Sequence, residues 1–401
     1  MGRGVAVSKN DHINVVDAPE PRKLRVFEAF SGIGAQNAAL KQLGVNYEIV
    51  GTSDWFVNAI LAYDAIHCSE APEEIKIPSF EEQVKYLEGF TFSIDSQNPL
   101  KKIRQLGKDI IQRLYVAQKR TKNFGSMTDL DPEKLPEMDV LVYSFPCQDL
   151  STGGNCTGMG RNSGTRSCMI WHVGRILRKL EKLNRLPEYL LMENVPAILL
   201  PRYAADFKKW KQLLNQLGYK NETPFVLDAT KFGIPQDRER LFMVSHLGGK
   251  IKIVDKIRAQ EKEWNGLVTD FLKLDYTNPV FREEAEDAKL NLTPSRQVMW
   301  NKNKRVEPFD KTTIIHTITC NMDRTQTAAL FKYGDVIRRL TIREAFLLMG
   351  FSEEDYERIL PLEFTYRQKN KLIGNSIVVP VLKAIFKAML SGTEFLPEEA
   401  Q

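Results

Sequence analysis

The sequence predicts an α/β protein in which apolar strands alternate with helices, joined to a smaller, irregular, β-rich region. Three observations support this fold class. Between residues 23 and 245, short apolar runs recur, and stretches of helical periodicity separate them. From about residue 246 to residue 338 this alternation is lost and the sequence becomes charged and irregular. The chain has 401 residues, which is long enough for two domains.

These patterns divide the chain into three parts. Residues 1–21 are polar and irregular, and we expect a flexible tail there. Residues 22–245 together with residues 370–401 form the predicted main domain. Residues 246–369 form the predicted smaller domain and its hinge.

The composition narrows the functional classes. There are 56 Lys and Arg residues against 51 Asp and Glu, a net charge of +5 that is compatible with a nucleic-acid partner. Five cysteines without CxxC spacing and five histidines without an HExxH motif argue against a disulfide scaffold or a metal site. No apolar run approaches the ~18 residues of a membrane span, and no signal-peptide core follows Met1. We expect an intracellular protein without a bound metal and without a membrane partner.

The first strand is predicted at residues 23–30 and runs directly into a glycine turn, Ser31–Gly34, that opens a helix. Glycines let the backbone approach a ligand, and the helix start offers free N–H groups. A second strand, at residues 47–53, ends at Asp54-Trp55, twenty residues after Gly34. An acid at this place can accept hydrogen bonds from ribose hydroxyls, and Trp55 can stack on adenine. Because the full GxGxxG pattern is absent, this Rossmann-like site suits a nucleoside smaller than a dinucleotide.

Residues 56–124 are longer than a single crossover requires, and we expect mostly helix there, with a loop at residues 93–99. Between residues 101 and 122 there are eight basic residues and one acid. Such a cluster is either a solvated helix face or a face that contacts phosphates.

The third strand, Val140–Ser144, stops at Pro146, which cannot continue a central strand. Cys147 follows it, under a glycine-rich loop. A thiol at a strand end is either a nucleophile or a small buried apolar residue. The loop continues with glycines, hydroxyls and arginines up to Ser167, a mixture suited to a phosphate backbone.

A helix at residues 170–183 leads to an apolar strand that begins at Tyr189 and ends in Glu193-Asn194, the strand tip next to the one that carries Cys147. A helix at residues 204–217 and a strand at residues 225–228 follow. In the next strand Arg238 and Arg240 lie two residues apart, so they point the same way, toward a site or simply toward solvent.

The last third of the chain carries fewer signals. Residues 311–324 are polar and β-prone, and residues 340–349 read as an amphipathic helix. Gly374-Asn375-Ser376 reads as a glycine turn that opens a final apolar helix at residues 377–389.

Seven segments then match one family in order and spacing: Phe27–Gly34, Asp54-Trp55, Pro146-Cys147-Gln148, Glu193-Asn194-Val195, Gln236–Arg240, Arg339–Phe351 and Gly374-Asn375-Ser376. The chain resembles the DNA cytosine-C5 methyltransferases from Val26 to Leu390. Residues 143–151, 163–167 and 190–195 look most similar to small single-chain bacterial members, including those that methylate CpG. The resemblance implies a Rossmann-like S-adenosylmethionine-dependent methyltransferase domain with a smaller target-recognition domain.

The resemblance also implies roles for individual residues. Cys147 would add to C6 of cytosine, and Glu193 would hold N3 and the exocyclic amine. Arg240 would contact O2, with Arg238 stabilising the loop or a phosphate. The expected cofactor is S-adenosyl-L-methionine, which leaves as S-adenosyl-L-homocysteine. The residues implied in its binding are Phe30, Ser31, Gly32, Ile33, Gly34, Asp54, Trp55, Ser126, Met127, Pro146, Gln148, Asn375 and Ser376.

The implied partner is double-stranded DNA, with the target cytosine flipped into the pocket. The residues expected to contact DNA are Ser151, Arg161, Arg166 and Arg324. We expect a monomer in the cytoplasm of a prokaryote or a phage-infected cell. A cognate restriction endonuclease is a further partner that the resemblance allows.

Two departures from the family pattern limit these expectations. The third cofactor segment reads Gly125-Ser126-Met127, where the family often has an acid that contacts the adenine amine. Residues 317–324 do not resemble the serine-glycine-alanine-asparagine run associated with CpG enzymes, so the target sequence stays open. Arg324 is the candidate for reading guanine.

Three other functions would explain part of these sequence features. A tRNA cytosine methyltransferase would share the fold, but the long recognition region favours duplex DNA. A silent DNA-binding scaffold would not need Cys147, Glu193 and Arg240. A nicotinamide dehydrogenase would need the fuller glycine fingerprint and leaves Pro146-Cys147-Gln148 unexplained.

Overall fold

The computed structural model describes residues 22–69, 75–146, 166–249, 251–290, 293–302, 306–322, 330–333 and 336–397. The tail predicted at residues 1–21 lies outside these ranges. Cys147 and most of the glycine-rich loop that follows it also lie outside them.

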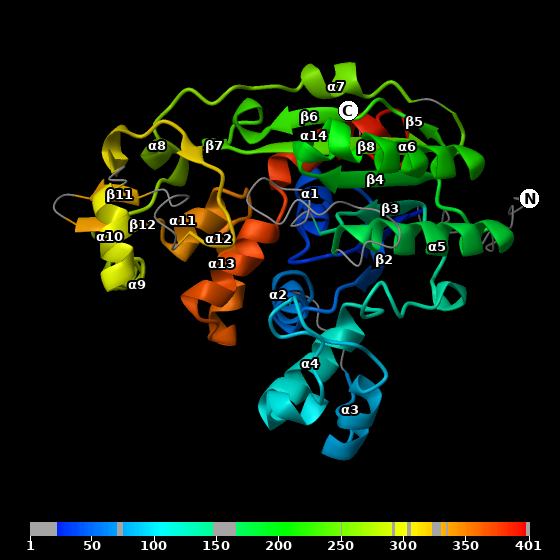
Figure 1. Ribbon diagram of the computed structural model, residues 1–401, viewed down its shortest axis with the longest axis horizontal. Helices are drawn as coiled ribbons and strands as arrows, with labels where there is room; N and C mark the ends of the chain where they lie inside the picture. The colour runs from blue at the N-terminus through cyan, green and yellow to red at the C-terminus, as the bar shows by residue number, and fades with distance from the viewer. Residues whose placement is uncertain are drawn as a thin grey trace, which may run out of the picture.

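A central mixed sheet organises the main part of the chain (Figure 1). Its strand order is β2 (Tyr47–Ser53), β1 (Leu24–Ala29), β3 (Val140–Tyr143), β4 (Tyr189–Asn194), β8 (Glu239–His246) and β5 (Lys220–Asn221), with β6 (Phe225–Asp228) also paired to β8. The first four strands are parallel, and β8 runs antiparallel to β4. The carboxyl ends of β1 to β4 therefore meet at one edge, where α/β proteins bind their ligands.

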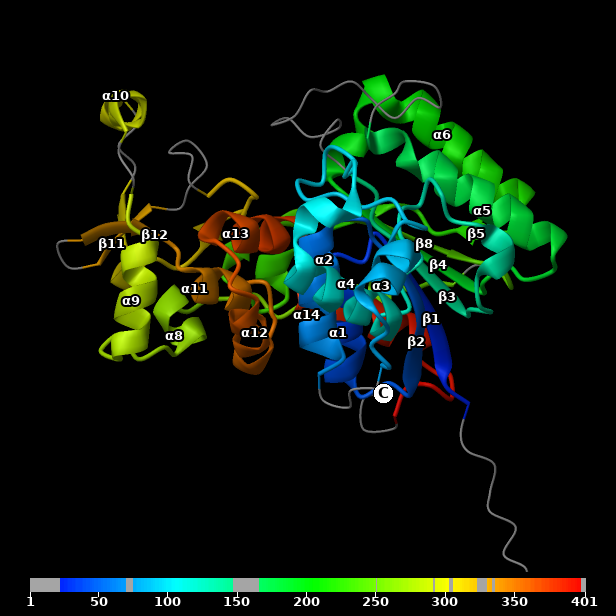
Figure 2. The ribbon, with the colours of Figure 1, turned by 90° about the horizontal axis from the view of Figure 1, so that it is seen from below.

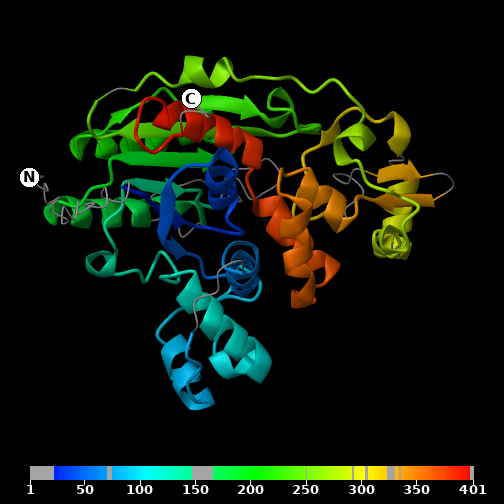
Figure 3. The ribbon, with the colours of Figure 1, turned by 180° about the vertical axis from the view of Figure 1, so that it is seen from behind.

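Helices cover both faces of this sheet (Figure 2). One face carries α1 (Ala35–Leu43), α2 (Val57–His67) and α14 (Val379–Leu390), and the other carries α5 (Ile170–Lys182) and α6 (Pro201–Gln216). Figure 3 shows α14 beside α1, and the two helices are in contact.

The alternation along each strand explains this two-sided core. In β3, Val140 and Val142 face the α1 side, while Leu141 and Tyr143 face the α5 side. Buried residues on both faces give the near-continuous apolar runs by which the strands were predicted.

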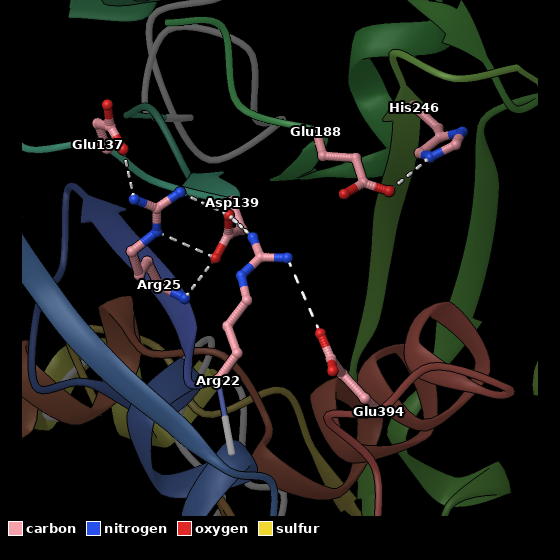
Figure 4. Close-up of polar contacts among 7 residues, drawn as sticks. All are labelled: Arg22, Arg25, Glu137, Asp139, Glu188, His246 and Glu394. Atoms are coloured by element: carbon pink, nitrogen blue, oxygen red, sulfur yellow. Dashed lines mark hydrogen bonds and ion pairs between the residues drawn. The ribbon is translucent and has the colours of Figure 1, made fainter. Parts of the chain in front are cut away.

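An ionic cluster of Arg22, Arg25, Glu137, Asp139 and Glu394 holds the amino-terminal edge of the sheet (Figure 4). Figure 4 also shows a separate pair, in which His246 Nε2 lies 3.1 Å from Glu188 Oε1. Asp139, directly before β3, accepts hydrogen bonds from Arg22 Nη2 at 2.6 Å and from the Arg25 backbone N–H and Nη2, both at 2.9 Å. Burial alone would raise the pKa of Asp139, but the bonds from Arg25 outweigh it and hold the pKa below its ordinary value. The cluster fixes the register of β1 against β3 at the edge opposite the candidate site.

A helical projection lies below α2 in Figure 1 and contains α3 (Phe80–Leu87) and α4 (Lys108–Arg120). Part of the basic cluster is engaged within this projection. Arg120 pairs with Asp64 of α2, Arg113 pairs with Asp109, and Arg104 pairs with Glu81. Of the three pairs only Arg120–Asp64 is largely buried, so Arg120 serves the fold, and the interpretation of the rest of the cluster stays open.

The region after β8 contains more helix than the sequence suggested. It has α7 (Val254–Arg258), α8 (Val268–Leu272), α9 (Pro279–Asp287) and α10 (Pro294–Lys302), with short strands β9 (Glu307–Pro308), β10 (Ile315–His316), β11 (Leu330–Tyr333) and β12 (Val336–Arg339). Strand β10 pairs with β7 (Gln236–Asp237), and β12, β11 and β9 form a separate small sheet. Charged helices such as α9, which has no buried residue, lack the apolar face that makes a helix visible in sequence.

The chain then returns through α11 (Ile342–Leu347), α12 (Glu353–Ile359) and α13 (Tyr366–Asn375). The glycine turn expected at Gly374 is absent, because Gly374 and Asn375 are the last two residues of α13. One stretch, Tyr366–Leu390, is long and apolar enough to cross a membrane by length and composition, but 67% of its apolar 18-residue window is buried inside the fold. Its second half is α14, which packs on α1 and α7 as a core helix does.

Candidate active site

The glycine turn after β1 is shaped for a ligand. Phe30, Gly32 and Gly34 all have positive φ angles, of 58°, 55° and 75°, and Phe30 adopts this conformation although it has a side chain. The backbone N–H groups of Phe30 and Ser31 both donate to the Ser53 carbonyl oxygen, at 2.8 and 3.3 Å, so the ends of β1 and β2 are joined. A Cβ atom on Gly32 would meet nothing within 4 Å, which leaves open space over the turn.

Asp54 lies against this turn, as predicted. Its Oδ2 accepts the Gly32 backbone N–H at 2.9 Å, and its Oδ1 accepts the Phe56 N–H at 2.8 Å. Burial raises the pKa of Asp54 to about 6, and the hydrogen bonds from Phe56 and Gly32 oppose the shift only in part. A carboxylate oxygen can accept more than one hydrogen bond, so this carboxylate can still accept from a ribose hydroxyl.

Asn123 is a site residue that the sequence analysis missed. Its Oδ1 accepts the backbone N–H groups of Asp54 and Gly125, both at 3.0 Å, and its Nδ2 donates to the Asp54 carbonyl oxygen and to Gln118 Oε1, both at 3.0 Å. Its side-chain amide thus fixes Asp54 against the third cofactor segment. The sequence gives no sign of this role, because an asparagine after a helix usually only ends it.

The other predicted cofactor residues fall into two groups. Ser31, Ile33, Met127 and Ser376 are buried, so their side chains belong to the structural support of the site. Those of Phe30, Trp55, Ser126, Pro146 and Asn375 are partly or fully exposed and could face a ligand. Gln148 lies outside the described residues.

The second half of the site is at the tips of β3 and β4. Glu193 is 8% exposed, and its Oε1 lies 3.4 Å from Arg240 Nε. Burial raises the pKa of Glu193, and the positive charges of Arg240 and Arg238 oppose the shift. The neighbouring Asn194 donates from Nδ2 to the Phe145 carbonyl oxygen at 3.0 Å. That bond fixes the chain at the residue before Pro146, and Cys147 is the next residue in the sequence.

Arg238 lies inside the fold, in the short break between β7 and β8. It is 2% exposed and donates to three backbone carbonyl oxygens, those of Ile318 at 2.7 Å, Gly374 at 3.0 Å and Ser376 at 2.7 Å. Segments 317–320 and 374–376 cover Arg238, while Arg240 is nearer the surface. The role expected for Arg238, stabilising the loop or a phosphate, stays a prediction, and the contacts of its guanidinium are internal to the fold.

The structure does not describe the side chains of the residues predicted to contact DNA. Ser151, Arg161 and Arg324 are not among the described residues, and of Arg166 only the backbone is described, at the start of a 3₁₀ turn, Arg166–Met169. Within the described ranges, no group of three or more His, Cys, Asp or Glu side chains could hold a metal ion.

Comparison with known proteins decides the family. The pattern of the C-5 cytosine-specific DNA methylase family matches residues 101–391. The chain belongs to this family. The methylase is 38% identical over 376 residues to the orphan methyltransferase M.SssI of Spiroplasma monobiae, covering 91% of this chain and 96% of that protein. It is 31% identical over 374 residues to the type II methyltransferase M2.ScrFI of Lactococcus lactis subsp. cremoris, covering 91% and 99%.

The fold of the methylase is also that of a solved structure. The crystal structure of the S. pombe Dnmt2 methyltransferase superposes with a TM-score of 0.61 at 20% identity and covers 92% of this chain and 98% of that one. The predicted α/β fold is thereby confirmed. The family match confirms the predicted activity: this chain is a DNA (cytosine-5-)-methyltransferase, of a family that acts on DNA and uses S-adenosylmethionine.

Proposed function

We propose that the methylase modifies C5 of a cytosine flipped out of duplex DNA, and that Cys147, Glu193 and Arg240 carry out the addition step. The pair of the buried Glu193 and the half-buried Arg240, next to the chain segment that enters Cys147, supports this assignment. In this site the carboxyl group and the guanidinium are held together at the strand tips, where a base entering from the duplex would meet both.

Each of the three side chains has a defined task in this proposal. C5 of cytosine is a poor nucleophile until another nucleophile adds at C6, and the Cys147 thiolate forms that covalent bond. Glu193 holds N3 and the exocyclic amine; because burial raises its pKa, it keeps a proton available to N3 at a higher pH than an exposed carboxyl would. Arg240 contacts O2, where negative charge develops. The described structure gives Arg238 no direct contact in this step.

The glycine turn and the end of β2 fit the cofactor that the family uses. S-adenosylmethionine supplies the methyl group when bound. The open space over Gly32 and the Asp54 carboxylate suit the ribose, and the partly exposed Trp55 suits the adenine. Ser126 replaces the usual acid, so the adenine amine is contacted by its hydroxyl or by backbone groups. Asn375, exposed at the end of α13, is proposed at the methionine end with the buried Ser376.

We further propose the DNA contacts, the oligomeric state, the cellular location and the partner enzyme of the methylase. DNA is contacted by Ser151, Arg161, Arg166 and Arg324, and residues 246–369 carry target recognition. The protein acts as a monomer in a bacterial cytoplasm. A cognate restriction endonuclease is compatible with the type II relative, and its absence is compatible with the orphan relative.

Two measurements test the proposed function. Genomic DNA is incubated with the protein and S-adenosylmethionine and then sequenced after bisulfite treatment. We expect a short consensus around protected cytosines, and none with Cys147→Ala. In parallel, a duplex with 5-fluorocytosine at the target is incubated with the protein and cofactor. The fluorine at C5 cannot leave as a proton does, so the wild type should stay covalently attached.

The alanine variant must still bind S-adenosylhomocysteine, so that its inactivity reports on the thiol. Full methyl transfer by Cys147→Ala would contradict the covalent mechanism. Protection that appears only on RNA would contradict the substrate.

A further inference from the structure

Arg238 joins two segments that are far apart in the sequence. The three carbonyl groups that its guanidinium contacts belong to residues 80, 136 and 138 positions further along the chain. One is Ile318, in the segment before Arg324, and the others are Gly374 and Ser376, beside Asn375 in the proposed cofactor site. A buried charge is stable only when its donors are satisfied, so these contacts are a structural requirement of the buried guanidinium.

The same two segments also touch directly. A Cβ atom on Gly374 would lie 2.3 Å from the Cys320 backbone nitrogen and 2.4 Å from the Thr319 carbonyl carbon. Only a glycine allows so close an approach of the two backbones. The Cys320 thiol donates to Asn375 Oδ1 at 2.8 Å. Asn375 is therefore held by the segment that precedes Arg324.

Gln236 and Arg238 fix the first segment on both sides of one residue. Gln236 Oε1, in β7, accepts the Ile318 backbone N–H at 3.1 Å, while Arg238, between β7 and β8, donates to the Ile318 carbonyl oxygen. Gln236 Nε2 donates to the Leu348 carbonyl oxygen at 2.8 Å. Two residues beyond Arg238, β8 carries Arg240, the partner of Glu193.

We infer that Arg238 is a positioning residue that couples the recognition segment, residues 317–320, to the cofactor segment, residues 374–376. The inference rests on the proposed function, because it takes residues 374–376 as part of the cofactor site. A DNA target that fixes residues 317–320 also fixes residues 374–376 and so raises the affinity for the cofactor. A bound cofactor raises the affinity for the DNA target by the same factor. Target binding and cofactor binding therefore strengthen each other through one guanidinium.

The test measures both affinities and their dependence on each other. The probe is S-adenosylhomocysteine, which binds without reacting, and the DNA is a duplex carrying the sequence found by bisulfite sequencing. The dissociation constant of the probe is measured by calorimetry without DNA and with saturating duplex, and that of the duplex is measured with and without the probe. Each pair of values gives a coupling ratio, which is the dissociation constant of one ligand alone divided by its value in the presence of the other. For the wild type we expect the two coupling ratios to agree, within the roughly five- to 150-fold range usual for coupled sites.

Arg238→Lys keeps the charge but replaces the wide planar fork of donors with a compact ammonium, so we expect it to lose the carbonyls of one of the two segments. We expect the coupling ratio of this variant to fall to within about twofold of one, while its affinity for the probe without DNA stays within about fivefold of the wild type. Arg339→Lys is the matched control. Arg339 is also buried and also donates to three backbone carbonyls, but all three belong to residues 287–289. It should keep the wild-type ratio.

A second variant keeps the inference testable if Arg238→Lys does not fold. Gly374→Ala suits a helix end but places a methyl group against the Thr319–Cys320 backbone, so it should also lower the ratio. A wild-type ratio of one, or an unchanged ratio in folded Arg238→Lys and Gly374→Ala, would overturn the inference. If the wild type still forms the covalent adduct with 5-fluorocytosine DNA in that case, the proposed function survives. A wild type that forms no adduct would overturn the proposed function instead.

Discussion

Burial raises the pKa of two carboxyl groups of the candidate site, those of Asp54 and Glu193, but the neighbours of the two groups differ. Asp54 is bordered by backbone N–H groups, and no cation is among its hydrogen-bond partners in the described part of the chain. Glu193 is bordered by the guanidinium of Arg240. In the proposed function Asp54 must be ionised to accept from the backbone and a ribose, whereas Glu193 serves as a proton source.

Cofactor affinity should therefore depend on pH through Asp54. Burial places the pKa of Asp54 at about 6, so the carboxylate takes up a proton as the pH falls through 6. We expect the dissociation constant of S-adenosylhomocysteine to be constant above pH 7 and to rise about tenfold for each pH unit lost below 6. Asp54→Asn should bind more weakly at pH 7.5 and show a flat profile from pH 5 to pH 7. Calorimetry across this range checks it, and a wild-type affinity that does not change between pH 7.5 and pH 5 would contradict it.

Removal of the Glu193 proton should affect the reaction and not the cofactor. Glu193→Gln keeps the shape of the side chain but has no proton to share with N3. We expect kcat to fall by about 10²- to 10⁴-fold, the usual contribution of a positioned acid or base. The dissociation constant of S-adenosylhomocysteine should stay at the wild-type value. Single-turnover methylation of a target duplex measures the first quantity. A loss of less than tenfold would remove Glu193 from the addition step.

At the scale of elements, the glycine turn depends on helix α2, which packs behind it. His67 Nε2 donates to the Ile33 carbonyl oxygen at 2.9 Å, and burial lowers the pKa of His67 to about 4, so the ring is neutral and carries its proton on this nitrogen. A Cβ atom on Gly34 would lie 2.3 Å from the same nitrogen and 2.7 Å from Tyr63 Cε2. Gly32 has a similar φ angle but open space around it.

Alanine at these two glycines should therefore have different effects. Gly32→Ala adds backbone strain of about 1–2 kcal/mol and places a methyl group where the cofactor is proposed to lie. Gly34→Ala adds the same strain and also displaces His67 and Tyr63. We expect Gly32→Ala to lose cofactor affinity with a modest loss of unfolding free energy, and Gly34→Ala to lose clearly more unfolding free energy. Urea unfolding and probe titration measure both, and equal losses of stability in the two variants would refute the crowding argument.

The elements that could be predicted are those whose evidence is local. Strands β1, β3 and β4 are buried on nearly their whole length, and polar or proline residues follow them, so an apolar run with a clear stop indicates each of them. Strand β2 lies at the edge of the sheet and is only partly buried, and its stop at Asp54 indicates it. Helix α13 could not be predicted, because it contains Gly374 and few apolar residues. The glycine there allows a close backbone contact with residues 319 and 320, and a single sequence does not distinguish that need from a turn.

On the scale of the whole molecule, the site is assembled from contacts that spacing does not encode. The roles proposed for Cys147, Glu193 and Arg240 come from their motifs and the family resemblance. The supporting contacts of Asn123 and Arg238 could not be predicted from either, since each depends on which distant backbone groups the fold brings close. Such contacts satisfy buried polar groups, and any Asn or Arg in the sequence has the chemistry to make them.

One buried group should make the stability of the whole protein depend on pH. Glu28 is the second-to-last residue of β1, is 0% exposed and faces the core on the α1 side. Burial raises its pKa from 4.5 to about 8, and the nearby Tyr63 hydroxyl and Asn37 backbone N–H only partly oppose this. The folded protein thus keeps a proton at neutral pH that the unfolded chain releases. Stability conferred by this proton is present below pH 4.5 and is lost as the pH rises toward 8.

Glu28→Gln isolates this effect, because glutamine keeps the shape and stays neutral at every pH. Each pH unit between the two pKa values costs the wild type about 1.4 kcal/mol, so its unfolding free energy should fall by roughly 3–4 kcal/mol relative to Glu28→Gln between pH 5 and pH 8. Other groups titrate in both proteins and cancel in the difference. Urea unfolding at half-unit pH steps gives that difference directly. Parallel curves for the two proteins would mean that Glu28 is ionised in the fold, and a cationic or hydrogen-bonding partner would then have to reach it inside the sheet.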